Sequence, residues 1–315
     1  MAAIETRSLT KRFGDVVAVR DLDLTVEAGE VYGFLGPNGA GKSTTINLLL
    51  DFMRPSEGSA TVLGHDAQAE SRTVRERIGI LPEGFSLYDR LTGREHLSFT
   101  VDAKDADDDP DALLEQVGLS AEDAERRVGG YSKGMSQRLA LGCALVGDPD
   151  LLILDEPSSG LDPHGIQQMR EILRAEADRG TAVFFSSHIL SEVEAVADRV
   201  GIMNEGELVA ENTVEGLREM SDATSQLLLD VERVPADLDL TALDGVASAT
   251  PDGERLRVAF TDPAAKAEAV ERVNAATRVT DIESEEASLE DLFTSYTTED
   301  EPSDDAVEAP AEVSA

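Results

Sequence analysis

A glycine-rich loop between two apolar segments constrains this chain more than any other feature. The loop reads Gly-Pro-Asn-Gly-Ala-Gly-Lys-Ser-Thr over residues 36–44, after an apolar run at 31–35 and before another at 46–50. This order predicts a buried strand, a phosphate-binding P-loop and a helix. Backbone N–H groups must wrap closely around a polyphosphate, and glycine permits that approach because it has no Cβ. We therefore expect a nucleoside triphosphate as the ligand.

The polar groups of the loop have separate predicted roles. Lys42 supplies a charge to the β- and γ-phosphates, and Ser43 supplies a hydroxyl ligand for Mg²⁺. The helix that follows adds the favourable dipole of its N-terminus. The nucleotide-binding residues predicted from the loop are Gly36, Pro37, Asn38, Gly39, Ala40, Gly41, Lys42, Ser43 and Thr44.

Two adjacent carboxylates end a second apolar run. Asp155 and Glu156 follow the uninterrupted apolar residues 151–154. Because side chains alternate along a strand, the two acids can serve different tasks. Asp155 suits the Mg²⁺ shell, and Glu156 suits the orientation or deprotonation of an attacking water. Beside the P-loop, this motif predicts hydrolysis of the nucleotide.

The charge of the chain is strongly negative and argues against a nucleic-acid partner. The 315 residues include 64 Asp or Glu and only 27 Lys or Arg, which gives a formal net charge of −37. Nucleic-acid binding needs clustered basic side chains, so we expect none here. The acidity and the scarcity of lysine are typical of halophiles and favour a haloarchaeal source, since carboxylates keep a surface soluble when salt screens charge. A basic partner protein is the other explanation that this charge allows.

The order of apolar runs predicts a large α/β domain followed by a smaller one. Short uninterrupted runs are typical of parallel strands buried on both faces; they lie at 78–81, 151–154 and 183–185. Strand-like runs of another kind lie at 16–19, 22–26 and 60–63. The segment 92–147 has a helical pattern that is broken by an acidic stretch near 102–111.

The pattern changes after about residue 225 and predicts a small α+β domain. Strand-like runs lie at 227–231, 256–260 and 279–282, with a helical segment at 263–275. We predict domains at 1–220 and 221–297, and an acidic disordered tail at 298–315. No segment approaches 18 consecutive apolar residues and the N-terminus lacks a signal-peptide core, so we expect a soluble, cytoplasmic chain.

Several motifs together resemble the ATP-binding-cassette (ABC) ATPases, over residues 4 to about 220. Residues 131–138, Tyr-Ser-Lys-Gly-Met-Ser-Gln-Arg, look like the signature motif that the family usually writes Leu-Ser-Gly-Gly-Gln. Ser132 and Gly134 match that pattern, whereas Lys133 and Met135 depart from it. In the family this helix start reaches across a dimer to the γ-phosphate of ATP held by the other subunit. The resemblance therefore implies that Ser132 and Gly134 contact the nucleotide.

The resemblance implies further site residues. Residues 159–162, Ser-Gly-Leu-Asp, are similar to the loop through which the two subunits sense each other's sites. His188 would contact the γ-phosphate, and Phe13 would stack on adenine, although packing in the core is the other role open to Phe13. Glu83 stands where the family usually has a Gln that touches Mg²⁺ and the water; it keeps an oxygen donor and adds a charge. The alternative prediction is that Glu83 faces outward as a solvated loop residue.

The resemblance also implies a fold and a function. The fold is an α/β P-loop NTPase cassette with a parallel core sheet, an antiparallel β subdomain and a helical subdomain, plus the small C-terminal α+β domain. The predicted catalytic residues are Glu156 and His188, and the predicted Mg²⁺ ligands are Ser43, Glu83 and Asp155.

The implied activity is ATP hydrolysis coupled to transport. ATP would close a head-to-tail homodimer, and a separate polytopic membrane permease would hold the chain at the inner face of the membrane. Residues 87–95 and 287–293 look like those of the export branch. A non-transport ABC ATPase and an ATP-switched regulatory module remain alternatives.

Overall fold

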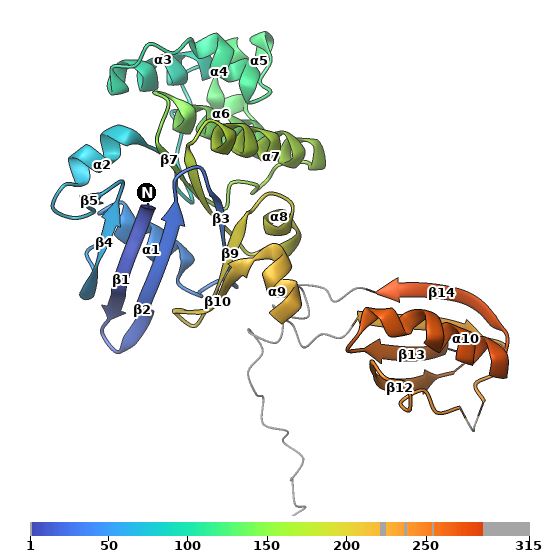
Figure 1. The fold of residues 1–315 in the computed structure, drawn as a ribbon. Helices are drawn as coiled ribbons and strands as arrows, with labels where there is room; N and C mark the ends of the chain where they lie inside the picture. Colours follow the sequence, from blue (N-terminus) through green and yellow to red (C-terminus); the bar gives the residue numbers. More distant parts are fainter. Residues whose placement is uncertain (1, 221–224, 236–237, 254, 286–315) are drawn as a thin grey trace, which may run out of the picture.

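The computed structural model describes residues 2–220, 225–235, 238–253 and 255–285 (Figure 1). The predicted acidic tail at 298–315 and the export-type segment at 287–293 lie outside these residues. Both therefore stay predictions.

A mostly parallel sheet forms the centre of the fold, as the uninterrupted apolar runs predicted. In the described chain it has six strands in the order β10-β9-β3-β8-β7-β6, and only β10 runs antiparallel to its neighbour. The strands are β3 (Val31–Leu35), β6 (Ile78–Leu81), β7 (Leu151–Asp155), β8 (Ala182–Ser187), β9 (Arg199–Asn204) and β10 (Glu207–Thr213). Every residue of β3, β7 and β8 is buried, which places helices or a second sheet on both faces.

A second, antiparallel sheet packs beside the first and encloses the helix that follows the P-loop. Its order is β2-β1-β4-β5, with β1 (Ala2–Phe13), β2 (Val16–Glu27), β4 (Glu57–Val62) and β5 (His65–Asp66). Helix α1 (Lys42–Leu49) buries Ile46 and Leu48 in one hydrophobic cluster with residues of both sheets. This packing fixes the start of α1, and with it the P-loop, against the carboxyl ends of the parallel strands.

A helical layer packs against β6 and shares one hydrophobic cluster with β6 and β7, and Figure 1 shows its helices together on one side of the cassette. It contains α3 (Gly93–Lys104), α4 (Pro110–Gln116), α5 (Ala121–Glu125), the 3-10 turn η1 (Val128–Gly130) and α6 (Lys133–Leu145). Local signals begin these helices: Thr92 and Glu95 form a capping box, and Asp109 caps α4 just before Pro110. The predicted break in the helical segment is confirmed between α3 and α4. The other helices of the cassette are α2 (Ser71–Arg77), α7 (Pro163–Asp178), α8 (Leu190–Glu194) and α9 (Val214–Met220).

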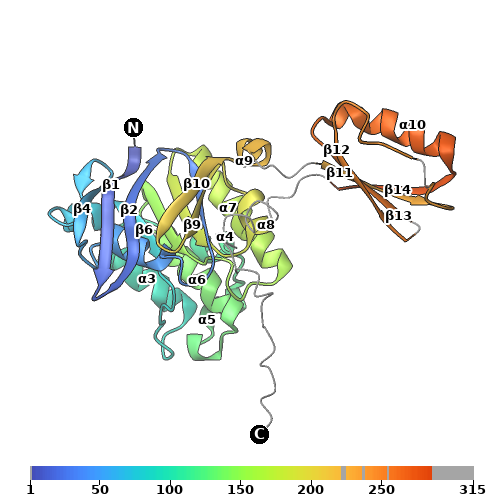
Figure 2. The same cartoon turned by 90° about the horizontal axis from the view of Figure 1, so that it is seen from below.

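The C-terminal residues form the small α+β fold that the sequence predicted. An antiparallel sheet in the order β12-β13-β11-β14 carries helix α10 on one face (Figure 2). The elements are β11 (Ser225–Val231), β12 (Val246–Asp252), β13 (Arg255–Phe260), η2 (Pro263–Ala265), α10 (Lys266–Ala276) and β14 (Val279–Glu285). Its hydrophobic cluster is made of residues between Leu227 and Val273.

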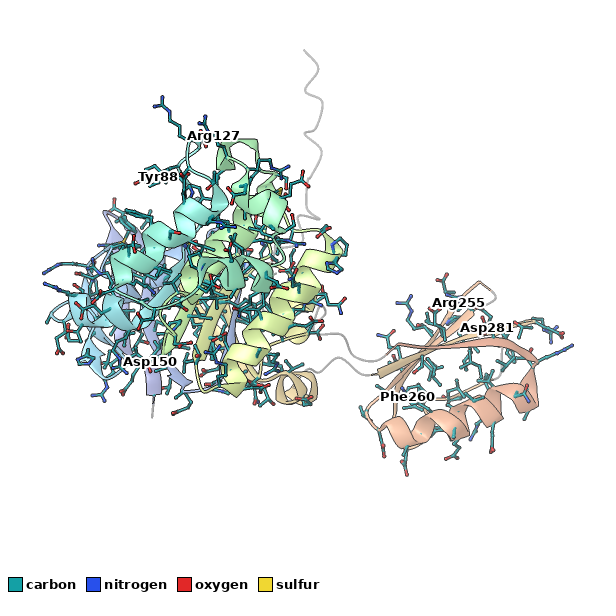
Figure 3. All side chains as sticks on the ribbon, turned by 90° about the horizontal axis from the view of Figure 1, so that it is seen from above. Tyr88, Arg127, Asp150, Arg255, Phe260 and Asp281 are labelled. Atoms are coloured by element: carbon teal, nitrogen blue, oxygen red, sulfur yellow. The ribbon has the colours of Figure 1, made fainter. Side chains whose placement is uncertain are left out.

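The sheet face away from α10 carries ion pairs of Arg255 in this C-terminal unit. Figure 3 shows Arg255 on that face, where its Nε donates to Asp230 Oδ1 over 2.6 Å. This hydrogen bond holds the pKa of Asp230 below its usual value.

Candidate nucleotide-binding and catalytic site

The P-loop wraps around the ammonium group of Lys42. This side chain is 5% exposed, and its Nζ donates to the carbonyl of Gly36 over 2.7 Å. The same Nζ lies 3.6 Å from Glu156 Oε1. The amide of Gly36 donates to the carbonyl of Ser187 over 3.2 Å, which joins the loop to the end of β8. The predicted phosphate-binding cation is thus buried next to the predicted catalytic carboxylate.

Two loop glycines are required by the packing of the protein itself. A Cβ at Gly36 would lie 2.5 Å from the carbonyl oxygen of Met203, and one at Gly41 would lie 2.4 Å from that of Ala18. Gly41 also has a φ of 107°, which side chains rarely adopt. The sequence analysis explained these glycines by the close approach of a phosphate. The structure adds a second reason, because the backbone of Met203 and Ala18 packs directly on the loop.

The acidic pair is held at the end of β7 by one serine of the neighbouring strand. Ser186 Oγ donates to Asp155 Oδ1 and accepts from the amide of Glu156 over 3.0 Å. Asp155 is 4% exposed, and Glu156 has a φ of 48° that turns the chain sharply after the strand. Ser186 therefore holds the carboxylate of Asp155 and the backbone of Glu156. The sequence analysis missed this residue, because a serine within an apolar strand has no distinctive pattern.

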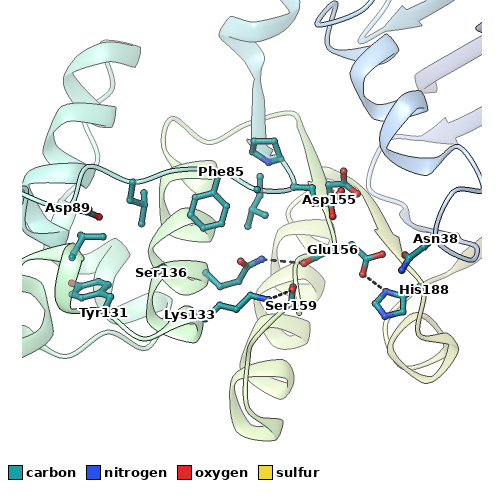
Figure 4. Close-up of a pocket in the computed structure, with 18 residues that line it drawn as sticks. Asn38, Phe85, Asp89, Tyr131, Lys133, Ser136, Asp155, Glu156, Ser159 and His188 are labelled. Carbon is teal, nitrogen blue, oxygen red and sulfur yellow. Dashed lines mark hydrogen bonds and ion pairs between the residues drawn. The ribbon is translucent and has the colours of Figure 1, made fainter. Parts of the chain in front are cut away.

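Glu156 and His188 contact each other across two loops (Figure 4). Glu156 Oε2 lies 2.9 Å from His188 Nδ1, while Oε1 faces Lys42. The structure therefore brings together Lys42, Glu156 and His188, which are far apart in the sequence. This arrangement places a carboxylate and an imidazole at the point where the loop and Lys42 would hold the γ-phosphate.

Glu83 turns toward the P-loop. Ser43 Oγ donates to Glu83 Oε2 over 3.2 Å, although Glu83 is an exposed residue. Glu83 thus reaches the P-loop serine while it stays exposed to solvent, and its role as a metal ligand stays a prediction. With Asp155, these residues offer a hydroxyl and two carboxylates, and such oxygen donors fit Mg²⁺. In the described part of the chain no cluster of three His, Cys, Asp or Glu side chains could hold a metal.

The start of α6, where the signature motif lies, packs on the loop after Glu156. Ser132 caps the helix, since its Oγ accepts from the amide of Met135 over 3.2 Å. A Cβ at Gly134 would lie 2.9 Å from the carbonyl oxygen of Gly160, so glycine allows this contact. Gln137 Nε2 donates to the carbonyl of Pro157 over 3.0 Å.

Lys133, one of the departures from the usual signature, has a partner in the same loop. Its Nζ donates to Ser159 Oγ over 2.9 Å (Figure 4). Asp162 caps α7, and the amide of Gly165 lowers the pKa of its carboxyl group. The loop 156–162 is therefore held from both sides, by α6 and by the start of α7.

Phe13 lies on the surface near the P-loop. Its ring is 48% exposed, and Lys11 Nζ lies 5.1 Å from the ring centre. The alternative prediction, that Phe13 packs in the core, is therefore wrong in this structure. Phe13 pairs with Val16 at the turn between β1 and β2, and the carbonyl of Ala18 on β2 packs on Gly41. The exposed aromatic ring thus lies on the hairpin that contacts the P-loop.

A cavity of about 650 Å³ extends from the catalytic carboxylates toward the helical layer. Figure 4 shows Asp155, Glu156 and His188 at one end, and Phe85 and Tyr131 toward the other. Burial raises the pKa of Tyr131, whose hydroxyl donates to the carbonyl of Asp123 over 2.6 Å. The cavity therefore has the catalytic carboxylates at one end and aromatic side chains, with Asp89, toward the other.

Comparisons with known proteins agree with this geometry. The ABC transporter family matches residues 19–159. The chain is 42% identical over 221 residues to the bacitracin transport ATP-binding protein BcrA of Bacillus licheniformis, which covers 68% of this chain and 71% of the relative. It is 36% identical over 294 residues to the daunorubicin resistance ATP-binding protein DrrA3 of Streptomyces coeruleorubidus, which covers 91% of this chain and 92% of the relative.

A solved structure shares the fold of the cassette. It is the dimeric structure of MJ0796, a bacterial ABC transporter cassette, with a TM-score of 0.62 and 22% identity. The match covers 67% of this chain and 98% of the other. At this identity the likeness shows the fold alone.

The chain belongs to the ABC transporter family, as an ATP-binding subunit. The predicted α/β P-loop fold is confirmed. Membership of the family confirms ATP hydrolysis at the level of the family, with ATP and Mg²⁺ as its ligands. Among the described helices none is long and apolar enough to cross a membrane.

Proposed function

We propose that this chain powers export through a separate polytopic membrane permease, at the inner face of the membrane. The printed names of two relatives support it, since one is a bacitracin transport protein and the other a daunorubicin resistance protein. Residues 87–95, which resemble the export branch, add to this support. The observation that carries the ATPase role is the contact of Glu156 with both Lys42 and His188.

We propose a task for each side chain during hydrolysis. The P-loop amides and Lys42 hold the β- and γ-phosphates, and Ser43, Glu83 and Asp155 hold the metal. Mg²⁺, when bound, supplies charge neutralisation on the phosphates. Glu156 orients the attacking water and accepts its proton. His188 contacts the γ-phosphate and holds the Glu156 carboxylate through the 2.9 Å contact.

A head-to-tail homodimer would complete each site. Ser132 caps the N-terminus of α6, where the helix dipole favours an anion. We propose that Ser132 and Gly134 contact the γ-phosphate of ATP held by the partner subunit. The dimeric structure of MJ0796, which shares the fold, supports this arrangement.

Copurification from native membranes tests the proposal. The tagged full-length chain is extracted with mild detergent at high KCl and purified by affinity, with an unrelated tagged acidic protein as the control. We expect a polytopic membrane protein that the control does not recover, and faster ATP hydrolysis when the two are reconstituted. An active ATPase that recovers no such protein would favour the non-transport alternative. Absence of turnover even with a recovered membrane subunit would favour the regulatory module.

A further inference from the structure

A buried carboxylate behind the site has no basic partner among the described residues. Glu192 lies on α8 and is 7% exposed. Its Oε2 accepts two hydrogen bonds, from Ser158 Oγ over 2.5 Å and from Ser187 Oγ over 3.1 Å. Burying a charge without a counterion raises the free energy of the folded state, and hydroxyl donors offset only part of that penalty. A leucine at this position would carry no such desolvation penalty, so we expect the carboxylate to have a function.

The two serines belong to the loops that carry the predicted catalytic pair. Ser158 follows Glu156 by two residues at the end of β7, and Ser187 directly precedes His188 at the end of β8. The hydroxyl of Ser187 also accepts from the amide of Ile189 over 3.0 Å, so it fixes the chain on the far side of His188. One carboxylate oxygen therefore joins both loops.

The P-loop is connected to the same point. The carbonyl of Ser187 accepts from the amide of Gly36, where the P-loop begins, over 3.2 Å. By contrast, His188 is 49% exposed and Glu156 is 15% exposed, so their 2.9 Å contact is not enclosed by packing. The distance between them depends on how the two loops are held.

We propose that Glu192 is a positioning residue for ATP hydrolysis. It clamps the loop of Glu156 to the loop of His188, and through Ser187 to the P-loop. The proposal rests on the roles assigned above to Glu156 and His188. A reacting group that is misplaced by about 1 Å can lose about a hundredfold in rate, so a clamp of this kind acts on turnover more than on binding.

The hydrogen-bond pattern provides a rescue variant. Both hydroxyls donate to one oxygen, Oε2, so Glu192→Gln keeps an acceptor for both while Glu192→Leu removes it. The double variant Ser158→Ala with Ser187→Ala deletes the two donors and, with Ser187, the acceptor of the Ile189 amide. Glu176→Leu is a matched control, because Glu176 on α7 is also a buried carboxylate, 3% exposed, that pairs instead with Arg179 just after the helix.

The test measures kcat, KM and the Kd for MgATP on the full-length protein at high KCl. We expect Glu192→Leu to lower kcat at least tenfold, about 1.4 kcal/mol, with a Kd within threefold of wild type. Glu192→Gln should restore kcat to within threefold, and the double serine variant should behave like Glu192→Leu. The control Glu176→Leu should keep the wild-type kcat per folded molecule.

Two results would overturn the proposal: a wild-type kcat in Glu192→Leu, or a loss of kcat that only follows the loss of folded, ATP-binding protein. If Glu192→Leu does not fold, the double serine variant tests the proposal in its place. A wild-type kcat in the double serine variant would then refute the clamp. Glu156→Gln is measured in parallel. Wild-type turnover in Glu156→Gln would refute the site itself, whereas its loss beside an unaffected Glu192→Leu would refute only the clamp.

Discussion

Replacing Glu156 by glutamine tests the catalytic assignment directly. Gln keeps the size of the side chain and can still contact His188, but it cannot accept a proton from water. General-base catalysis contributes about 10²- to 10⁴-fold to rate. We therefore expect kcat to fall by about that factor, which corresponds to about 2.7–5.4 kcal/mol.

The same change should strengthen ATP binding. Glu156 Oε1 lies 3.6 Å from Lys42 Nζ, and at an effective dielectric constant of about 20 this pair attracts by roughly 4.6 kcal/mol. Hydration regained by the separated groups offsets most of that energy. Without the carboxylate, the ammonium group of Lys42 interacts with the phosphates alone. A net gain of about 1 kcal/mol, or about fivefold in Kd, is the expected size.

The assay combines single-turnover hydrolysis with size-exclusion chromatography in ATP and Mg²⁺. We expect Glu156→Gln to bind ATP, to hydrolyse it slowly and to accumulate as a closed dimer. Glu171→Gln, an exposed carboxylate on α7, is the matched control and should behave as wild type. Hydrolysis within threefold of the wild-type rate, or a monomer at saturating ATP, would show that Glu156 does not activate the water.

Three further predictions concern the P-loop, the metal and the solvent. Lys42→Ala should weaken ATP binding, because the phosphates lose their main side-chain charge; an unchanged Kd by nucleotide titration would refute this role. Glu83→Gln should keep or raise Mg²⁺-dependent turnover, because an oxygen that faces Ser43 is kept while a charge near the γ-phosphate is removed; a collapse of activity across a Mg²⁺ titration would instead make the carboxylate an obligatory ligand. Molar KCl should raise the melting temperature, because salt screens the repulsion within a chain of net charge −37; a flat or falling melting temperature would remove the halophile interpretation.

The sequence predicted the central strands well because they are buried on both faces. The run at 78–81 coincides with β6, and those at 151–154 and 183–185 lie within β7 and β8. The runs at 16–19 and 22–26 were predicted separately, yet they form one strand, β2. The chain continues through the polar Asp21, whose φ of 42° accompanies the irregular pairing with β1. Such a bulge has no apolar pattern to reveal it.

Other elements were missed for similar reasons. Strand β12 (Val246–Asp252) is largely exposed and contains Pro251, so neither burial nor propensity marks it. At the site, sequence motifs supply the groups that face the nucleotide, but not the groups that hold them in place. Ser158 and Glu192 are 34 residues apart, and their contact exists only because the ends of β7 and β8 are neighbours. The supporting hydrogen bonds therefore became visible only in the structure.

Truncation after residue 222 tests the proposed division into domains 1–220 and 221–297. The cassette should keep its core, since Leu217 is the last of the described residues in its main hydrophobic cluster. The third cluster, between Leu227 and Val273, is separate. Every residue assigned to ATP lies at or before His188. We expect residues 1–222 to fold and to bind ATP within threefold of the full chain, with any change confined to dimer dissociation. If the folded truncation binds ATP tenfold worse, about 1.4 kcal/mol, the C-terminal segment contributes to the nucleotide site and this division is wrong.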